Sequence, residues 1–178
     1  FKIAKSEGLS KIKVVLDWQS DADLDASTFL CGDEGVILDD AGFVFYNSEN
    51  REKPFDRAVF GNKRKWMAET RPMSSDGAVL GSIDDRDGGQ GEQIDVDLDK
   101  VDPKVCEIVF VVSIHDEGKT FGDVEGASIS VVNAENEEEL CRYELAETFT
   151  EETALSVAKL VVNEDGDWEF EAVGVGHV

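Results

Sequence analysis

The sequence predicts an all-β protein, a β-sandwich of two mostly antiparallel sheets with a few short helices. Short segments rich in Val, Ile, Phe and Thr recur at intervals of about 10 to 15 residues. Gly, Asp and Asn, the usual turn residues, separate these segments. Apolar residues show no sustained helical period. Together these observations favour a sandwich or a barrel over a helical or an α/β domain.

Two of the expected strands indicate how the sheets are arranged. Residues 93–98 alternate between polar and apolar side chains, so one face of that strand should be solvated. Residues 108–114, within an expected strand 107–114, are apolar on both faces, as in a central strand. The remaining expected strands are 13–18, 25–31, 42–46, 128–132, 154–162 and 168–175.

The last two strands are predicted to form a hairpin. Residues 163–167, between these two Val-rich runs, contain Asp165 and Gly166, a dipeptide typical of tight hairpin turns. Residues 150–153 have the composition of a helix cap. The Val-rich segment that follows them instead favours a turn and then a strand.

Length and charge limit the classes of protein to consider. A chain of 178 residues is expected to form one domain spanning residues 1–178. Its 40 acidic and 17 basic residues leave a net charge of −23. Such a field makes nucleic acid and anionic membrane surfaces poor partners, whereas bound divalent cations would relieve its self-repulsion. A merely acidic, halophile-like surface is the plain alternative.

One segment departs from this acidity. Residues 51–71 hold seven basic and three acidic residues, a net charge of +4 that leaves −27 for the rest of the chain. The segment also contains Phe55, Phe60 and Trp66, and is predicted to be a long basic insertion between strands. It either folds back on the protein's own acidic surface or serves as a docking element for an anionic partner, with the aromatic residues as anchors.

The cysteines and the hydropathy favour a cytoplasmic protein. Cys31, Cys106 and Cys141 are odd in number, lack a C-x-x-C spacing and lie in or beside apolar stretches, where a free Cys usually acts as a small core residue. We therefore expect a reducing compartment and poorly reactive thiols. No apolar run approaches the roughly 20 residues that span a bilayer, so no direct membrane insertion is expected.

Two acidic clusters carry the predicted chemistry. In the first, Asp21, Asp23 and Asp25 alternate, so in an extended segment their carboxylates point the same way, about 6.5 to 7 Å apart. In the second, residues 84–92, carboxylates at both ends bracket glycines, which lets the backbone curl and turn carbonyl oxygens inward. A solvated acidic turn is the alternative interpretation of either cluster alone.

Calcium is the ion that these clusters suit. It takes about 6 to 8 hard oxygen ligands from carboxylates, carbonyls and water. Zinc would need His or Cys, and the chain has only two histidines. Neither cluster is an EF-hand. Counted from Asp21, the position that requires Gly is Ala26 and the position that requires Glu is Gly32, and in the second cluster the position that requires Glu is Asp95 or Val96. His115, at the end of an apolar strand, could orient a ligand carboxylate or simply end the strand in water.

Five segments that follow one another along nearly the whole chain stand out together, namely residues 23–30, 42–47, 75–79 followed by 84–86, 108–115, and 166–174. In this order they resemble the TerD family of tellurium-resistance and general stress proteins. The resemblance implies a two-sheet sandwich that binds one or two calcium ions in acidic loops. It also implies a cytoplasmic stress system whose partner proteins include an integral membrane protein, and no catalytic activity. The 84–92 loop is shorter than the family's and has fewer acids, and the 51–71 insertion has no counterpart in typical members. The implied metal ligands are Asp23, Asp25, Asn47, Asp84, Asp85, Asp87, Glu92 and Asp116, with the carbonyls of Gly89 and Gly91.

Enzymatic alternatives find less support in the residues. Paired acids on a β-scaffold also serve glycosidases, so a carbohydrate-binding or glycan-processing sandwich is the main alternative. Against it, aromatic residues make up only 8% of the chain and the three Trp residues are scattered. No G-x-S-x-G motif is present, which argues against a nucleophilic hydrolase. Direct tellurite chemistry at the cysteines would require thiols more reactive than their apolar surroundings predict.

Overall fold

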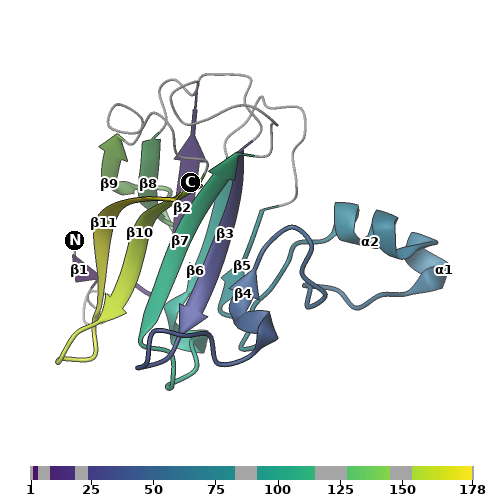
Figure 1. Cartoon of the computed structure of the whole chain (residues 1–178), viewed down its shortest axis with the longest axis horizontal. Coiled ribbons are helices and arrows are strands. Elements are labelled where there is room, and N and C mark those ends of the chain that lie inside the picture. The colour runs from purple at the N-terminus through teal and green to yellow at the C-terminus, as the bar shows by residue number, and fades with distance from the viewer. Residues whose placement is uncertain are drawn as a thin grey trace.

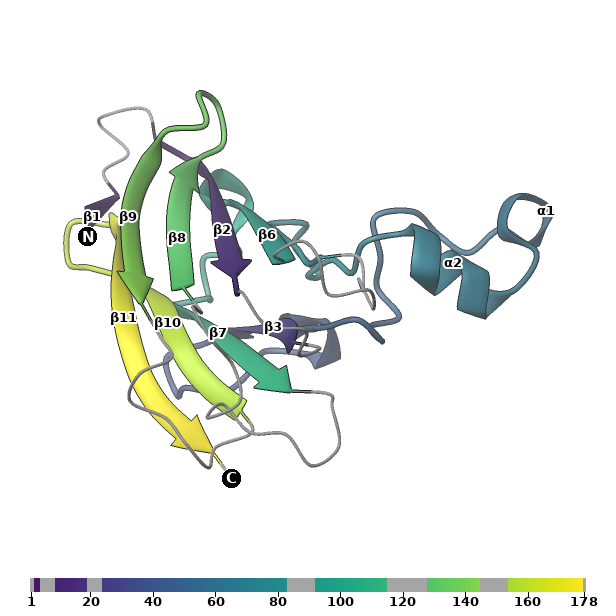
Figure 2. The same cartoon turned by 90° about the horizontal axis from the view of Figure 1, so that it is seen from above.

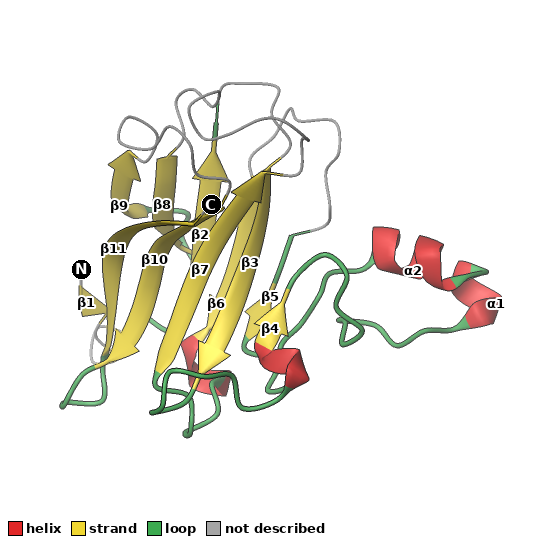
Figure 3. Ribbon diagram, viewed as in Figure 1, coloured by secondary structure: helices red, strands yellow, loops and turns green. Residues whose placement is uncertain are grey.

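Two antiparallel sheets pack face to face in the computed structural model of the chain (Figures 1 and 3). The structure describes residues 2–3, 9–18, 24–82, 92–114, 128–144 and 154–177. One sheet has the strand order β1-β11-β10-β7-β3-β4, and the other has the order β5-β6-β2-β8-β9. The predicted all-β sandwich is therefore confirmed.

The strands follow the chain in the order that their labels give. Their bounds are β1 Lys2–Ile3, β2 Lys11–Asp17, β3 Leu24–Cys31, β4 Phe43–Val44, β5 Val79–Leu80, β6 Glu92–Asp97, β7 Glu107–Ile114, β8 Ser128–Asn133, β9 Glu139–Glu144, β10 Ala154–Val162 and β11 Trp168–His177. Two short 3₁₀ helices, η2 (Asp40–Gly42) and η3 (Leu98–Lys100), and two α-helices, α1 (Arg57–Phe60) and α2 (Lys63–Glu69), complete the described elements.

The predictions about the central strand, the half-solvated strand and the last hairpin are confirmed. β7 lies between β10 and β3, inside its sheet, as a strand apolar on both faces should. β6 alternates in burial, with Ile94 and Val96 inside and their neighbours half-exposed. β10 and β11 form the expected hairpin, and Gly166 adopts the positive φ of 81° that its turn requires. The strand predicted after residues 150–153 is observed as β10. The turn predicted at residues 150–153 lies outside the described residues.

The predicted strand 42–46 is too long. It is reduced to the two residues of β4, because the Phe45 amide donates to the Ser48 hydroxyl at 3.0 Å and the chain turns there. The short or edge strands β1, β5 and β9 were not predicted. β9 is exposed or half-buried along its length, so it carries little of the alternation by which a strand is recognised.

The core fills the space between the sheets with side chains from the inward positions of both. One sheet supplies Ile12, Val14, Ile94, Val96, Ile129 and Val131, and the other supplies Ile108, Phe110, Val112, Leu155, Leu160 and Phe170. All of these side chains are at most 2% exposed. This packing fixes which way each strand faces and therefore which loops meet at each end of the sandwich.

The basic insertion leaves the sandwich as a helical arm. We call residues 51–71 the arm and residues 57–65 the arm tip. Helices α1 and α2 lie in the arm and project to one side of the two sheets in both views (Figures 1 and 2). The legs pair at their base, where the Glu52 amide donates to the Arg71 carbonyl and the Met73 amide donates to the Asn50 carbonyl. The arm thus joins the sandwich where its two ends, near residues 51 and 71, pair with each other.

Candidate functional site

The strand ends that flank the predicted metal loops lie at one end of the sandwich, which we call the loop end. In one sheet, Leu24 at the start of β3 pairs with Ile114 at the end of β7. In the other sheet, Glu92 at the start of β6 pairs with Leu16 near the end of β2. Because the strands are antiparallel, each pair joins the start of one strand to the end of its neighbour. Both pairs lie at the same end of the sandwich, at the top of Figure 1. Both acidic clusters therefore adjoin the loop end.

Asp25 and Glu92 connect the two clusters. The Ala26 amide on β3 donates to Oε2 of Glu92 on β6 at 2.6 Å, so this carboxylate crosses from one sheet to the other. Asp25, the residue before that amide, is 6% exposed and Glu92 is 5% exposed. A carboxylate removed from water must be paired, hydrogen-bonded or bound to a metal to remain charged. The loop end therefore holds one well-buried carboxylate from each predicted cluster.

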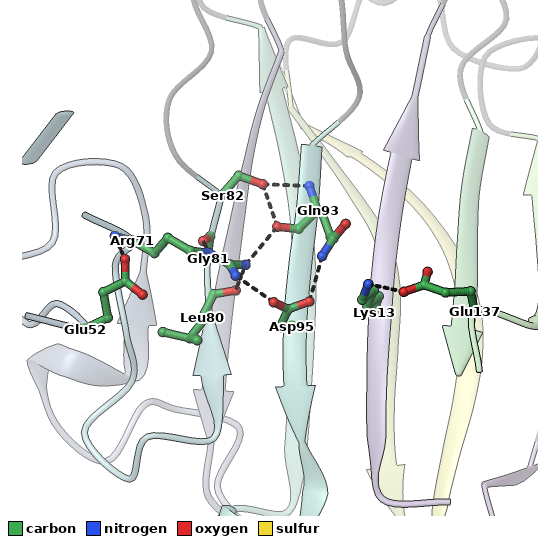
Figure 4. A network of polar contacts seen from close by, with 9 residues as sticks. All are labelled: Lys13, Glu52, Arg71, Leu80, Gly81, Ser82, Gln93, Asp95 and Glu137. Carbon is green, nitrogen blue, oxygen red and sulfur yellow. Dashed lines mark hydrogen bonds and ion pairs between the residues drawn. The ribbon is translucent and has the colours of Figure 1, made fainter. Parts of the chain in front are cut away.

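A hydrogen-bonded stem supports the second cluster (Figure 4). Ser82, just before the cluster, donates its hydroxyl to the Gln93 carbonyl at 2.6 Å and accepts the Gln93 amide at 2.7 Å. Residues 82 and 93 are thereby held together on either side of residues 83–91. This fixes the point from which Glu92 enters β6.

Arg71 reinforces the same stem from the base of the arm. Its guanidinium donates to the carbonyls of Leu80 at 3.1 Å and Gly81 at 2.7 Å, and more weakly to that of Gln93 at 3.4 Å. It also forms a 2.6 Å ion pair with Asp95 on β6 (Figure 4). The side chains of Arg71 and Asp95 are 21% and 31% exposed, so solvent screens the pair only in part. Arg71 thus joins the base of the arm to the two chain segments that flank residues 83–91.

The structure brings together some of the predicted ligands and not others. Glu92 reaches the backbone next to Asp25, as described above. Asn47 is exposed in the turn after β4, and no contact between described residues joins it to either carboxylate. Within the described part of the chain, no group of three or more His, Cys, Asp or Glu side chains is placed to hold a metal ion. The other predicted ligands lie outside the described residues, namely Asp23, Asp84, Asp85, Asp87, Gly89, Gly91 and Asp116, as do Asp21 and His115.

The arm tip does not fold back on the acidic body, whereas Arg71 at the base of the arm pairs with Asp95 as described above. Arg57, Lys63 and Arg64 are exposed and form no ion pair with any described residue, and Lys65 reaches only Glu69, 3.9 Å away within the arm. The predicted anchors point inward instead. Trp66 is 6% exposed, Phe60 is 7% exposed, and Phe55 packs edge-on against Trp66 with ring centroids 5.7 Å apart. The aromatic residues build the arm, and the cations of its tip face the solvent.

Arg51, which sequence analysis did not single out, organises the arm. It is 6% exposed, and its five N–H groups donate to five acceptors at 2.8 to 3.1 Å. These acceptors are the Thr70 hydroxyl and the carbonyls of Tyr46, Ser48, Met67 and Thr70. Its Cζ also lies 5.9 Å from the centroid of the Trp66 ring. A basic residue at the start of an insertion rich in aromatic residues is the only sequence signal for this role.

Two of the three cysteines contribute to the core, Cys31 as a buried residue and Cys141 packed partly buried against it. Cys31 is buried, Cys106 and Cys141 are half-buried, and all three are free thiols. Burial raises the pKa of the Cys31 and Cys141 thiols above the ordinary value. This confirms the predicted direction for these two residues, because a thiol surrounded by apolar groups disfavours the charged thiolate.

Comparisons with known proteins agree with the fold and with the arrangement of the strands. The TerD domain model matches residues 1–178. The tellurium resistance protein TerD of Serratia marcescens is 35% identical over 181 residues, covering 95% of this chain and 82% of its own. General stress protein 16U of Bacillus subtilis (strain 168) is 34% identical over 183 residues, covering 96% and 82%.

A solved structure extends the likeness to three dimensions. A homologue of telluride resistance protein (TerD) from Streptomyces coelicolor A3(2) superposes with a TM-score of 0.66 at 23% identity, covering 96% of this chain and 91% of that one. No helix within the described residues has both the length and the apolar character needed to cross a membrane. On the match along its whole length and the identity to these relatives, the chain belongs to the TerD domain family.

Proposed function

We propose that this protein is a calcium-binding, non-catalytic interaction module of a tellurium-resistance or stress-response system. The names of its relatives, tellurium resistance protein TerD and general stress protein 16U, support the physiological setting. Three free thiols fit a reducing cytoplasm. In this setting the protein acts by presenting an ordered surface to other proteins of the system, a membrane protein among them.

The observation that carries the calcium proposal is a pair of buried carboxylates at the loop end, one from each acidic cluster. Asp25 and Glu92 come from different sheets, and the Glu92 carboxylate accepts the amide of Ala26, the residue that follows Asp25. Carboxylate oxygens are hard ligands of the kind that calcium prefers. The chemistry of the donors therefore fits the ion. The residues that would hold it are Asp23, Asp25, Asp84, Asp85, Asp87 and Glu92, with the carbonyls of Gly89 and Gly91 and, at the margin, Asn47 and Asp116.

Bound calcium would link the fold to its ligand. The ion neutralises clustered carboxylates that repel one another, so the folded state should gain stability by mass action. At a calcium concentration of 100 times the Kd, this gain is about 2.7 kcal/mol. For a domain of this size it corresponds to a rise in Tm of roughly 5 to 10 °C. Magnesium, with its strict octahedral geometry, should give a smaller rise.

Calorimetric titration of the chelator-treated protein with calcium tests the proposal. Asp25→Asn and Glu92→Gln should each weaken binding at least tenfold. The Gln side chain keeps an oxygen to accept the Ala26 amide, so the second change should spare the fold. Glu164→Gln with Asp165→Asn, exposed in the turn between β10 and β11, is the matched control and should bind as the wild type does. Identical melting curves in calcium and in chelator, with no heat of binding, would refute the calcium proposal.

The carbohydrate-binding alternative gains no support from the three Trp residues. Sugar-binding sandwiches need exposed rings on which a pyranose can stack. Here Trp66 and Trp168 are 6% and 3% exposed, and Trp18 packs partly buried against the core. A screen on immobilised glycans that detects specific binding would restore this alternative.

A further inference from the structure

The arm tip combines concentrated positive charge with exposed apolar surface. Residues 57–65 contain four basic residues and no acidic one. Val59, between Arg57 and the cations of α2, is 65% exposed, the highest value among the exposed large hydrophobic residues of the described chain. In a protein of net charge −23, solubility does not require such a tip. Its composition is that of a surface built for contact.

The arm is also internally rigid, which a solvated loop has no need to be. Asp56 caps α1 by accepting the Ala58 amide, and Asn62 caps α2 by accepting the Lys65 amide. The indole N–H of Trp66 donates to the Lys53 carbonyl at 2.8 Å, and all five donors of Arg51 are used. A rigid surface loses little conformational entropy on binding. The tip is therefore pre-organised for a partner.

A complementary surface lies on the same protein, in the loop between β3 and β4. Residues 33–40 contain four acidic residues and no basic one. Val36 and Leu38 within this loop are 61% and 46% exposed, the next highest values after Val59. Leu38 and Asp39 also line a hollow of about 220 Å³ that two further acids, Asp76 and Asp102, and one cation, Lys104, border. We call residues 33–40 the acidic loop.

The arm tip and the acidic loop of one molecule do not meet. The arm projects away from the sheets in two perpendicular views, and the acidic loop follows the end of β3 opposite the loop end (Figures 1 and 2). No hydrogen bond or ion pair between described residues joins the two surfaces. Their complementarity in charge, and their shared exposure of aliphatic side chains, can therefore be satisfied only between molecules.

We propose that the arm tip docks on the acidic loop of a second copy of this chain. Val59 would pack against Val36 and Leu38, while the tip's cations face the acidic loop's carboxylates. Each copy carries one tip and one acidic loop, so a reciprocal exchange closes a symmetric dimer and a one-way contact builds a chain of copies. The contact is independent of the loop end and of calcium, and it goes beyond the proposed function.

Sedimentation velocity and light scattering of the full chain test this contact, in low salt and with or without millimolar calcium. The wild type should associate reversibly, and association should weaken as ionic strength rises from roughly 0.05 to 0.5 M, where charges are screened within a few ångströms. Lys63→Glu with Arg64→Glu should raise the dissociation constant at least tenfold. These acids lie in the first turn of α2, where the helix dipole favours them, so the arm should stay folded.

A charge swap separates the proposed contact from a general effect of net charge. Asp39→Lys with Asp40→Lys should also abolish association, because it replaces two carboxylates of the acidic loop with cations. Both positions are exposed and Asp39 makes no side-chain cap to η2, so the change removes one long hydrogen bond, from the Ser75 hydroxyl at 3.3 Å. The two pairs of changes combined in one chain should restore association to near the wild-type constant. Lys11→Glu with Lys100→Glu is the matched control, since it alters net charge as the tip variant does but at exposed positions outside the arm.

Three outcomes would overturn the proposal. A wild type that remains monomeric at millimolar concentration in low salt excludes a second copy as the partner and leaves a different protein to occupy the tip. A control that weakens association as much as the tip variant would assign the effect to net charge alone. The third outcome needs two combined variants, each carrying Lys63→Glu with Arg64→Glu. One adds Asp39→Lys with Asp40→Lys, and the other adds Asp33→Lys with Glu34→Lys. If neither restores association, the two surfaces do not meet.

Discussion

Replacing Arg51 by Lys should loosen the arm without unfolding the sandwich. The guanidinium donates five hydrogen bonds to four backbone carbonyls and one hydroxyl, and no carboxylate is among the acceptors. Burial lowers the pKa of Arg51, an effect that nearby Glu52 partly offsets. An arginine nevertheless stays charged at neutral pH. The arm thus closes around a buried cation whose donors are all satisfied.

The magnitude follows from the donors that Lys lacks. A lysine ammonium has three N–H donors at one point, against five in the planar fork of arginine. At least two charge-assisted hydrogen bonds are lost, and at about 1.5 kcal/mol each the opening of the arm becomes about 3 kcal/mol easier. Because a tenfold change corresponds to about 1.4 kcal/mol, the population of the opened arm should rise roughly 150-fold.

Hydrogen exchange and limited proteolysis measure this opening. Amides of α2 should exchange roughly 150-fold faster in Arg51→Lys, and trypsin should cleave faster after the exposed cations of the tip. Amides of β7 should keep their protection, because the arm joins the sandwich only where its two ends pair. Arg57→Lys, an exposed change in the same arm, is the control and should alter neither rate. Equal protection of α2 in Arg51→Lys and in the control would refute the role assigned to Arg51.

Two further predictions concern buried polar groups. Thr28 is fully buried and its hydroxyl has no hydrogen-bond partner among the described residues, so Thr28→Val should stabilise the fold by about 1 kcal/mol and raise Tm by about 2 to 4 °C. Thr28→Ser, which keeps the hydroxyl and loses the methyl group, should lower Tm instead, and a fall in Tm for Thr28→Val would contradict this account. The raised pKa of Cys31 and Cys141 means that the folded state holds these protons to higher pH, so labelling by a thiol reagent should reach half its maximal rate at higher pH than for a model thiol. The same linkage makes stability fall as pH rises through the thiol range, and replacing both residues by Ala should remove that part of the pH dependence.

The sandwich was predictable because its information is local. β6 alternates residue by residue, β7 is apolar on both faces, and the 163–167 turn contains an Asp-Gly dipeptide, so each could be recognised from a short window of sequence. β4 was overestimated because its end depends on the Ser48 hydroxyl rather than on any change in side-chain pattern. β9 escaped prediction because an edge strand is solvated on much of its surface and needs no strict alternation.

The arm shows what local information leaves out. Its helix caps, Asp56 and Asn62, are visible in the sequence, yet α1 and α2 have only four and seven residues, too few to establish a helical period. The residue that holds them together, Arg51, bonds to groups that lie 16 and 19 positions further along the chain and are mostly backbone carbonyls. A backbone acceptor leaves no mark in the sequence. The charge of the insertion was therefore predictable, whereas its architecture was not.

The acidic residues at the two ends of the sandwich differ in burial, although the sequence shows both only as clusters of Asp and Glu. Asp25 and Glu92 at the loop end are about 5% exposed, whereas Asp39 and Asp40 in the acidic loop are exposed. A desolvated carboxylate is stable only beside a compensating charge or a set of donors, which suits a bound cation. An exposed carboxylate keeps its water and acts at a distance, which suits the recognition of a charged partner surface. One acidic sequence can thus form an ion site at one end of the sandwich and a docking surface at the other, and replacing an acid at one end should leave the function of the other unchanged.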